Sequence, residues 1–122
     1  MDAETTYTEL KSIALQEFPD VVVSASILRG PLHVAESLRI FLTDASFIEI
    51  WISDYKYSYH WQRTDGTIYR HDNAPHKKHR HIKMFPKHFH DCSEDNVKES
   101  AIGDNPADAL RDVLRFVRDK VR

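Results

Sequence analysis

Hydrophobic and polar residues alternate with a period of two, or form short β-branched runs, between residues 21 and 71. These patterns are typical of β-strands with one buried face. They predict five strands, at 21–28, 36–43, 47–52, 55–62 and 67–71. Turn sequences separate the strands: Gly30-Pro31, Asp44-Ala45-Ser46, Ser53-Asp54 and Asp65-Gly66. We therefore expect an antiparallel meander of about five strands.

Helical spacing of apolar residues predicts one helix near each end of the chain. Thr6-Tyr7-Thr8-Glu9 has the form of a capping box and starts a helix expected over 6–17. Asn105 followed by Pro106 is a favourable helix start, and an amphipathic pattern continues from there. The expected class is therefore α+β, with one domain, residues 1–122, whose two helices cover the aliphatic face of the sheet.

Neither the strand-like nor the helical spacing of apolar residues is found between residues 72 and 91, in the sequence DNAPHKKHRHIKMFPKHFHD. Two prolines and many polar residues favour a long ordered loop there, with a short strand at 82–85. The next stretch, 93–104, is polar, and we expect it to be mobile. Seven of the 8 histidines of the chain lie between His60 and His90, so this region is where we expect chemistry.

Composition narrows the range of partners and surroundings. The 122 residues carry a net charge of -2, so any affinity for nucleic acid must come from a local patch. No apolar run of about 18 residues predicts a membrane span, and the polar N-terminus does not resemble a signal peptide. With a single cysteine, Cys92, no internal disulfide can form, and we expect a cytoplasmic protein without membrane contact.

The turns also predict which side chains share the face of the sheet that the helices leave uncovered. The loop after the second strand places Arg39 opposite Trp51, and a two-residue turn at Asp65-Gly66 places His60 opposite His71. The predicted uncovered face carries Arg39, Phe41, Glu49, Trp51, Lys56, Ser58, His60, Gln62, Tyr69 and His71. Such a face can also be an ordinary solvated surface.

The side chains of this face suit the cleavage of RNA without a metal ion. RNA carries its own nucleophile, the 2′-hydroxyl, so an enzyme needs a base, an acid and cations for the charge that develops on phosphorus. Histidine suits both proton roles because its pKa lies near neutrality. We expect His60 to share proton transfer with another histidine. The candidate partners are His71, His76 and His88. Lys56, Arg39 or Arg70 could stabilise the charge, and we expect Lys56 and Arg39 to bind phosphate.

Three alternative roles for the histidine-rich region stay open. His76-x-x-His79-x-His81 and His88-x-His90-Asp91 offer ligands for zinc or another transition metal, although neither spacing matches a strong motif. The basic run 77–83 could hold phosphates, or it could be an exposed loop. Cys92 could act as a nucleophile beside these histidines. We expect no resident metal or other cofactor, with a metal-dependent nuclease as the alternative.

Several motifs resemble the TumE family of toxins from toxin–antitoxin systems. The resemblance spans about residues 20–92 and is carried by Tyr57-Ser58-Tyr59-His60-Trp61-Gln62, Asp72-Asn73-Ala74-Pro75-His76 and Phe85-Pro86-Lys87-His88-Phe89-His90. The insertion 77–81 departs from the family pattern. The resemblance implies a toxin encoded beside an antitoxin that carries a DNA-binding helix-turn-helix. A ribonuclease-type action is the common expectation for such small toxins.

The resemblance and the residue chemistry together define the expected site. We expect catalytic roles for His60, His71, Asp72, His76 and Lys56, with a further contribution from His88 and His90. The expected RNA contacts are Arg39, Trp51, Tyr59, Trp61, Tyr69, Asn73, Lys77 and Lys78. The expected partners are RNA and the cognate antitoxin, and a homo-oligomer is left open. A non-catalytic module that binds RNA or protein in an operon complex is the alternative.

Overall fold

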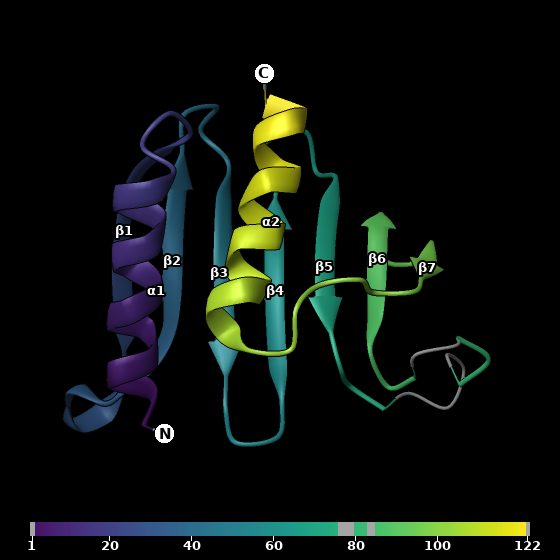
Figure 1. Ribbon diagram of the computed structural model, residues 1–122, viewed down its shortest axis with the longest axis horizontal. Coiled ribbons are helices and arrows are strands. Elements are labelled where there is room, and N and C mark those ends of the chain that lie inside the picture. The colour runs from purple at the N-terminus through teal and green to yellow at the C-terminus, as the bar shows by residue number, and fades with distance from the viewer. Residues whose placement is uncertain (1, 76–79, 83–84, 122) are drawn as a thin grey trace.

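A single antiparallel sheet forms the centre of the molecule in the computed structural model, which describes residues 2–75, 80–82 and 85–121 (Figure 1). The elements in chain order are α1 (Ala3–Glu17), β1 (Val22–Arg29), η1 (Pro31–His33), β2 (Ala35–Leu42), β3 (Phe47–Ile52), β4 (Tyr57–Gln62), β5 (Ile68–Asp72), β6 (His88–Cys92), β7 (Val97–Lys98) and α2 (Pro106–Val121). The seven strands found in the described part of the chain lie side by side in sequence order. The expected α+β class is confirmed, with seven strands instead of about five.

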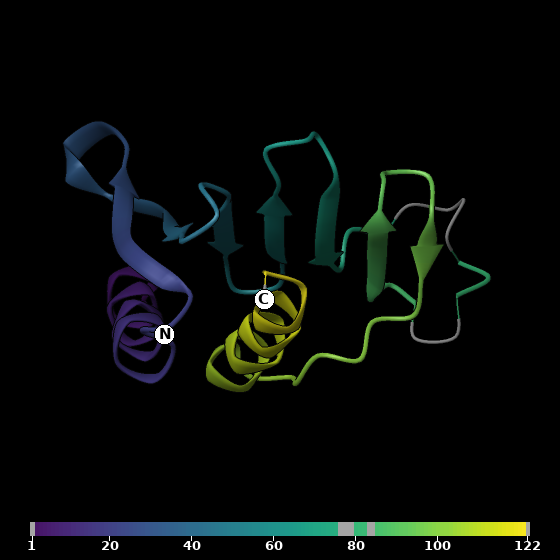
Figure 2. The same ribbon diagram turned by 90° about the horizontal axis from the view of Figure 1, so that it is seen from above.

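Both helices cover the same face of the sheet, as the view from above shows (Figure 2). Helix α1 packs on β1 and β2, and α2 lies across the middle of the sheet in front of β4 (Figure 1). Aliphatic side chains such as Leu38, Ile40 and Ile50 are completely buried on this side. The opposite face carries no α-helix from the described residues. Its polar side chains range from exposed, as at Lys56, to buried, as at His88 and His90. No helix in the described ranges has the length and apolarity needed to cross a membrane.

Helix α1 begins earlier than the sequence predicts. Asp2 is the N-cap, because its carboxylate accepts a hydrogen bond of 2.8 Å from the Thr5 amide. Thr6 lies inside the first turn and is buried, so the capping box predicted at Thr6 is wrong. The start of α2 is confirmed, because Asn105 Oδ1 accepts a 2.9 Å hydrogen bond from the Asp108 amide.

The hairpin turns before β3 and after β4 lie at the same end of these strands and are of the same kind. Thr43-Asp44-Ala45 and Thr64-Asp65-Gly66 are three-residue loops whose third residue has a positive φ, 70° for Ala45 and 91° for Gly66. Each aspartate accepts a hydrogen bond from the amide two residues later, at 3.0 Å from Ser46 and 2.9 Å from Thr67. The predicted loop at 44–46 and the predicted two-residue turn at Asp65-Gly66 are therefore each wrong by one residue.

These turns decide which side chains share a face. Arg39 pairs with Glu49 instead of Trp51, and the turn after β3 is Asp54-Tyr55 instead of Ser53-Asp54. Each of these differences shifts the strand pairing by two residues, so every side chain of β2, β3 and β4 keeps its predicted face. The pairing of β4 with β5 differs from the prediction by one residue, because His60 pairs with Arg70 and not with His71. A slip of one residue moves every side chain of a strand to the other face. The whole of β5 is therefore inverted relative to the prediction.

The predicted loop between residues 72 and 91 contains a strand that the sequence pattern did not reveal. Strand β6 pairs with β5 and places His88 opposite Asp72. The strand predicted at 82–85 is not found at its two described positions, Ile82 and Phe85, which lie in a bend and a turn. In the stretch 93–104, expected to be mobile, β7 pairs with β6 and Ser100 is buried.

Candidate functional site

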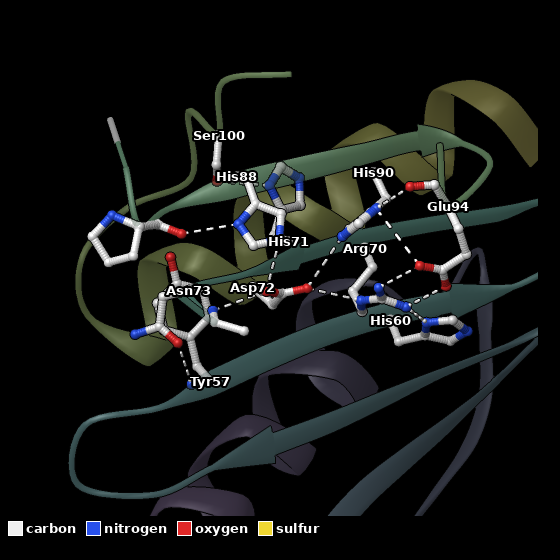
Figure 3. Close-up of polar contacts among 12 residues, drawn as sticks. Tyr57, His60, Arg70, His71, Asp72, Asn73, His88, His90, Glu94 and Ser100 are labelled. Atoms are coloured by element: carbon white, nitrogen blue, oxygen red, sulfur yellow. Dashed lines mark hydrogen bonds and ion pairs between the residues drawn. The ribbon is translucent and has the colours of Figure 1, made fainter. Parts of the chain in front are cut away.

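Polar side chains from three neighbouring strands meet on the uncovered face of the sheet (Figure 3). The register places His60 of β4 opposite Arg70 of β5, and Arg70 opposite His90 of β6. One step along the same face, Asp72 lies opposite His88. The observed register of β5, one residue away from the predicted one, therefore brings Arg70 and Asp72 to this face.

Arg70 is the centre of the cluster. Its two terminal nitrogens donate to the two oxygens of Glu94, each at 2.7 Å, and its Nε donates to Asp72 Oδ2 at 2.8 Å. His60 Nδ1 lies 3.4 Å from the Nη1 atom that also contacts Glu94. The Arg70 guanidinium lowers the pKa of the Glu94 carboxyl, so this group is ionised at neutral pH. A carboxylate and an imidazole thus both contact the Nη1 atom of one guanidinium cation.

Asp72 is held on both of its oxygens. Oδ2 accepts from Arg70, and Oδ1 accepts a 3.0 Å hydrogen bond from the Ala74 amide. His88 Nε2 lies 2.9 Å from Oδ1, and His90 Nε2 lies 3.5 Å from Oδ2. The two imidazoles therefore point at one carboxylate.

His88 and His90 are both buried, with 1% and 4% of their surface exposed. The Nδ1 atom of His88 lies 2.9 Å from the carbonyl oxygen of Pro86, and that of His90 lies 2.9 Å from the carbonyl oxygen of Glu94. Burial lowers the pKa of His90, with a smaller contribution from the Arg70 charge. The carboxylate beside these histidines is Asp72, since Asp91 lies on the other face, bound to Lys98 at 2.7 Å.

His71 does not lie near His60, so the pair predicted from the register is wrong. His71 is on the helix side of the sheet, where its ring stacks on Phe89 with centroids 4.2 Å apart and its Nδ1 contacts Ser100 Oγ at 2.8 Å. Burial lowers its pKa to about 4, so the ring is neutral near pH 7. A half-buried, neutral ring on the covered face, packed on Phe89, has a structural role.

Three aromatic residues expected to contact RNA are buried in the core instead. Tyr59, Trp61 and Tyr69 expose 3%, 1% and 8% of their surface. Trp61 stacks on Tyr69 at 5.1 Å, and its indole nitrogen donates to Ser46 Oγ at 2.8 Å. Bases stack on exposed ring faces, so these three positions are corrected to structural residues.

Arg39 and Asn73 are occupied by contacts within the protein. Arg39 donates through Nε to Glu49 at 2.8 Å and lies over the Phe47 ring, so the expected role of a free phosphate-binding cation does not fit it. Asn73 accepts from the Tyr57 amide and donates to the Tyr55 carbonyl, both at 3.0 Å. Asn73 thereby fixes the start of β4 against the end of β5.

A surface cavity of about 460 Å³ opens beside this cluster. Its lining includes Trp51, Lys56, Asp72 and Asn73, four of the residues predicted from the sequence. Trp51 is 44% exposed, and Lys56 is exposed as well. The structure therefore brings these four predicted residues together at one end of the uncovered face.

Some of the predicted residues cannot be placed. His76, Lys77 and Lys78 lie outside the described residues, as does His79. Cys92 is exposed at the end of β6.

Sequence reasoning missed Glu94, and it named Arg70 as a candidate cation but placed it on the wrong face of the sheet. Arg70 was assigned to the covered face because the turn before β5 was taken to be one residue shorter than it is. The matching sequences Thr43-Asp44-Ala45-Ser46 and Thr64-Asp65-Gly66-Thr67 are the signal that indicates equal loop lengths. Glu94 follows β6 in a stretch without hydrophobic periodicity, and no local signal pointed to it.

Comparison with known proteins agrees with the resemblance in the motifs. The family model described as Toxin TumE matches residues 11–121, which extends the similarity beyond residues 20–92 into both helices. No curated protein sequence and no solved structure matches the chain. Members of this family are toxins of toxin–antitoxin systems, which implies a cognate antitoxin as partner. The match covers nearly the whole chain, and the protein belongs to the TumE toxin family.

Proposed function

We propose that this toxin cleaves RNA on the uncovered face of its sheet, by proton transfer between His60, Glu94 and the RNA. The observation that carries the proposal is the meeting of His60 and Glu94 at Arg70, beside an accessible cavity with an exposed tryptophan. His60 keeps its expected role. Its partner in this proposal is Glu94. Of the three candidate histidines, His71 lies on the covered face, His88 is buried against Asp72, and His76 lies outside the described residues.

The proposed reaction is transesterification within the RNA strand. The Glu94 carboxylate removes the proton of the 2′-hydroxyl, whose oxygen attacks the adjacent phosphorus. The bond from phosphorus to the 5′ oxygen breaks, and the imidazolium of His60 protonates that leaving oxygen. Arg70 stabilises the charge of the phosphorane. The products are a 2′,3′-cyclic phosphate and a free 5′-hydroxyl.

The cavity next to the cluster suits one nucleotide. Trp51 exposes its ring on the cavity wall and can stack on a base, while Lys56 at the same wall can bind a backbone phosphate. This arrangement replaces the set of RNA contacts expected from the sequence. It retains Trp51 from that set, adds Lys56, which was expected to bind phosphate within the catalytic group, and omits the three buried aromatic residues.

The test compares three active-site variants with a matched histidine control. The active-site substitutions keep the approximate size of each side chain: His60→Gln, Glu94→Gln and Arg70→Lys. The control, His33→Gln, changes an exposed histidine that lies between β1 and β2, outside the cluster. Purified toxin, freed from its antitoxin, is incubated with single-stranded RNA. Loss of a general acid or base typically reduces the rate about 10²- to 10⁴-fold, so the first two variants should lose that much and the control nothing.

The end groups of the products test the chemistry independently. RNA fragments should carry 2′,3′-cyclic phosphates, and a substrate with a 2′-deoxyribose at the cleaved position should remain intact. Full cleavage by His60→Gln would contradict the assignment of His60. RNA binding without cleavage by the unchanged protein would instead support the non-catalytic binding module.

A further inference from the structure

Asp72, His88 and His90 form a buried group with the composition of a metal site. Their side chains expose 10%, 1% and 5% of their surface. Histidine and aspartate are rarely buried to this extent unless they are paired or bind a metal ion. The group touches the RNA-cleavage cluster at Arg70 but none of its three members carries a role in the proposed reaction.

The two imidazoles are oriented as they are in metal sites. A carbonyl oxygen only accepts hydrogen bonds, so the contacts to Pro86 O and Glu94 O require a hydrogen on each Nδ1 atom. Nε2 is then the nitrogen of each ring that can coordinate a metal. Both Nε2 atoms face Asp72, at 2.9 and 3.5 Å from its oxygens. Backbone carbonyls commonly fix metal-binding histidines in this way.

The carboxylate is also held in place from outside the group. Arg70 Nε and the Ala74 amide each donate to a different oxygen of Asp72. Glu94 binds Arg70 through both terminal nitrogens and so balances the guanidinium charge. The acidic groups at this place, Asp72 and Glu94, outnumber the one arginine between them, which favours an additional cation.

We propose that Asp72, His88 and His90 bind one divalent transition-metal ion, and that the ion is zinc. The three ligand atoms lie within 4.8 Å of one another. Ligand atoms on a tetrahedral zinc ion are about 3.4 Å apart, as the Zn–N distance of about 2.0–2.1 Å requires. The two distances to Asp72, 2.9 Å to Oδ1 and 3.5 Å to Oδ2, are close to that value. Zinc binding therefore requires mainly that the widest separation in the group, up to 4.8 Å, becomes shorter.

The ligand types decide which metal fits. Two imidazole nitrogens and one carboxylate oxygen suit zinc and its neighbours in the first transition row, whereas magnesium and calcium prefer oxygen ligands throughout. Three protein ligands leave a fourth position for water. The sequence suggested His88-x-His90 with Asp91 as one of two alternative metal motifs, and the fold replaces Asp91 by Asp72 from the neighbouring strand.

The proposed ion would stabilise the fold at one place. Asp72 is the last residue of β5, and His88 is the first residue of β6. Zinc would therefore tie together the two ends of the segment that joins these strands. Because the ligands converge only in the folded chain, zinc should raise the melting temperature by mass action. This proposal does not depend on RNA cleavage, since its readouts are metal content, spectrum and melting temperature.

The experiment must separate this group from the other histidines of the sequence. We would combine His76→Gln, His79→Gln and His81→Gln in one triple variant, which keeps Asp72, His88 and His90. Separate variants, His88→Gln, His90→Gln and Asp72→Asn, remove single ligands. Each purified chain is stripped with a chelator and titrated with Zn²⁺ by calorimetry. Co²⁺ then reports the coordination geometry through its visible absorption bands.

The proposal predicts one Zn²⁺ per chain for both the unchanged protein and the triple variant. Each single-ligand variant should weaken zinc binding by more than the roughly 10–100-fold that loss of an outer hydrogen-bond partner costs. Absence of binding to the unchanged, folded chain would overturn the proposal, and so would loss of binding in the triple variant. If a single-ligand variant does not fold, the triple variant decides the matter through its Co²⁺ spectrum. A spectrum of octahedral, fully hydrated Co²⁺ would leave Asp72 and the histidines as an ion pair.

Discussion

The two tryptophans of this chain lie in opposite environments, and their replacement should separate folding from RNA binding. Trp61 is 1% exposed and packs on Tyr69 and on Phe116 of α2, whereas Trp51 is 44% exposed on the uncovered face. We predict that Trp61→Ala destabilises the protein strongly without altering an RNA contact. Trp51→Ala should weaken RNA binding and leave stability nearly unchanged.

The expected magnitudes follow from these environments. Removing a buried tryptophan side chain costs about 3–5 kcal/mol, and Trp61 also loses its 2.8 Å hydrogen bond to Ser46. For a domain of this size we expect a fall in melting temperature of about 12–20 °C. An exposed substitution such as Trp51→Ala changes stability by no more than about 0.5 kcal/mol. Stacking of one base is worth about 1–3 kcal/mol, so RNA affinity should fall by about 5- to 150-fold.

Thermal unfolding and tryptophan fluorescence measure the two effects separately. With Trp61→Phe, Trp51 is the only tryptophan left, and a single-stranded RNA should quench its emission. With Trp51→Phe, the emission of Trp61 should be insensitive to RNA. Equal destabilisation by Trp61→Ala and Trp51→Ala would refute the assignment of the two faces. So would RNA quenching that persists in Trp51→Phe.

Three further predictions concern groups whose contacts are local. Asn73→Ala removes the acceptor of the Tyr57 amide, so it should lower the free energy of unfolding by about 1–3 kcal/mol and speed hydrogen exchange of that amide. Unchanged exchange would show that Asn73 does not hold β4. Burial raises the pKa of Tyr59 above 10.0, so the folded chain retains a proton that the unfolded chain loses. The stability due to this group is complete below pH 10 and declines above it by about 1.4 kcal/mol per pH unit. Urea midpoints above pH 10 should therefore fall less steeply in Tyr59→Phe, and equal slopes would argue against its burial. Asn105→Ala should cost about 0.5–2 kcal/mol in urea unfolding by removing the cap of α2, while Asn105→Ser should recover most of the loss.

The hydrophobic pattern was sufficient to locate most elements of the fold. Strand β3 was predicted with its observed ends, 47–52, and β2 was displaced by only one residue. These strands alternate clearly because one face packs against helices and the other meets solvent. Strand β6 escaped the prediction because His88 and His90 are buried polar residues, so its sequence does not alternate between apolar and polar types.

The candidate site was predicted only in part, because it depends on how strands are aligned. His60, Trp51 and Lys56 were assigned to the correct face by alternation within the first four strands. His71 and Arg70 exchanged faces because a single register error affects every residue of β5. Alternation separates the residues of one strand into two faces. It does not specify which residues of the next strand join each of these faces, because that depends on the length of the turn.

The turn at residues 64–66 therefore determines which chemistry this face can perform. With two loop residues, His71 would lie opposite His60, and Arg70 and Asp72 would point toward the helices. The observed loop has three residues and ends at Gly66, whose φ of 91° costs glycine little but costs other residues about 1–2 kcal/mol. The same loop after β2 uses Ala45 at this position, so the aspartate in the middle of each turn must contribute to the preference. Because the turn adds one residue to the loop, an arginine and an aspartate face the histidines of β6, and His71 packs against Phe89 on the covered face.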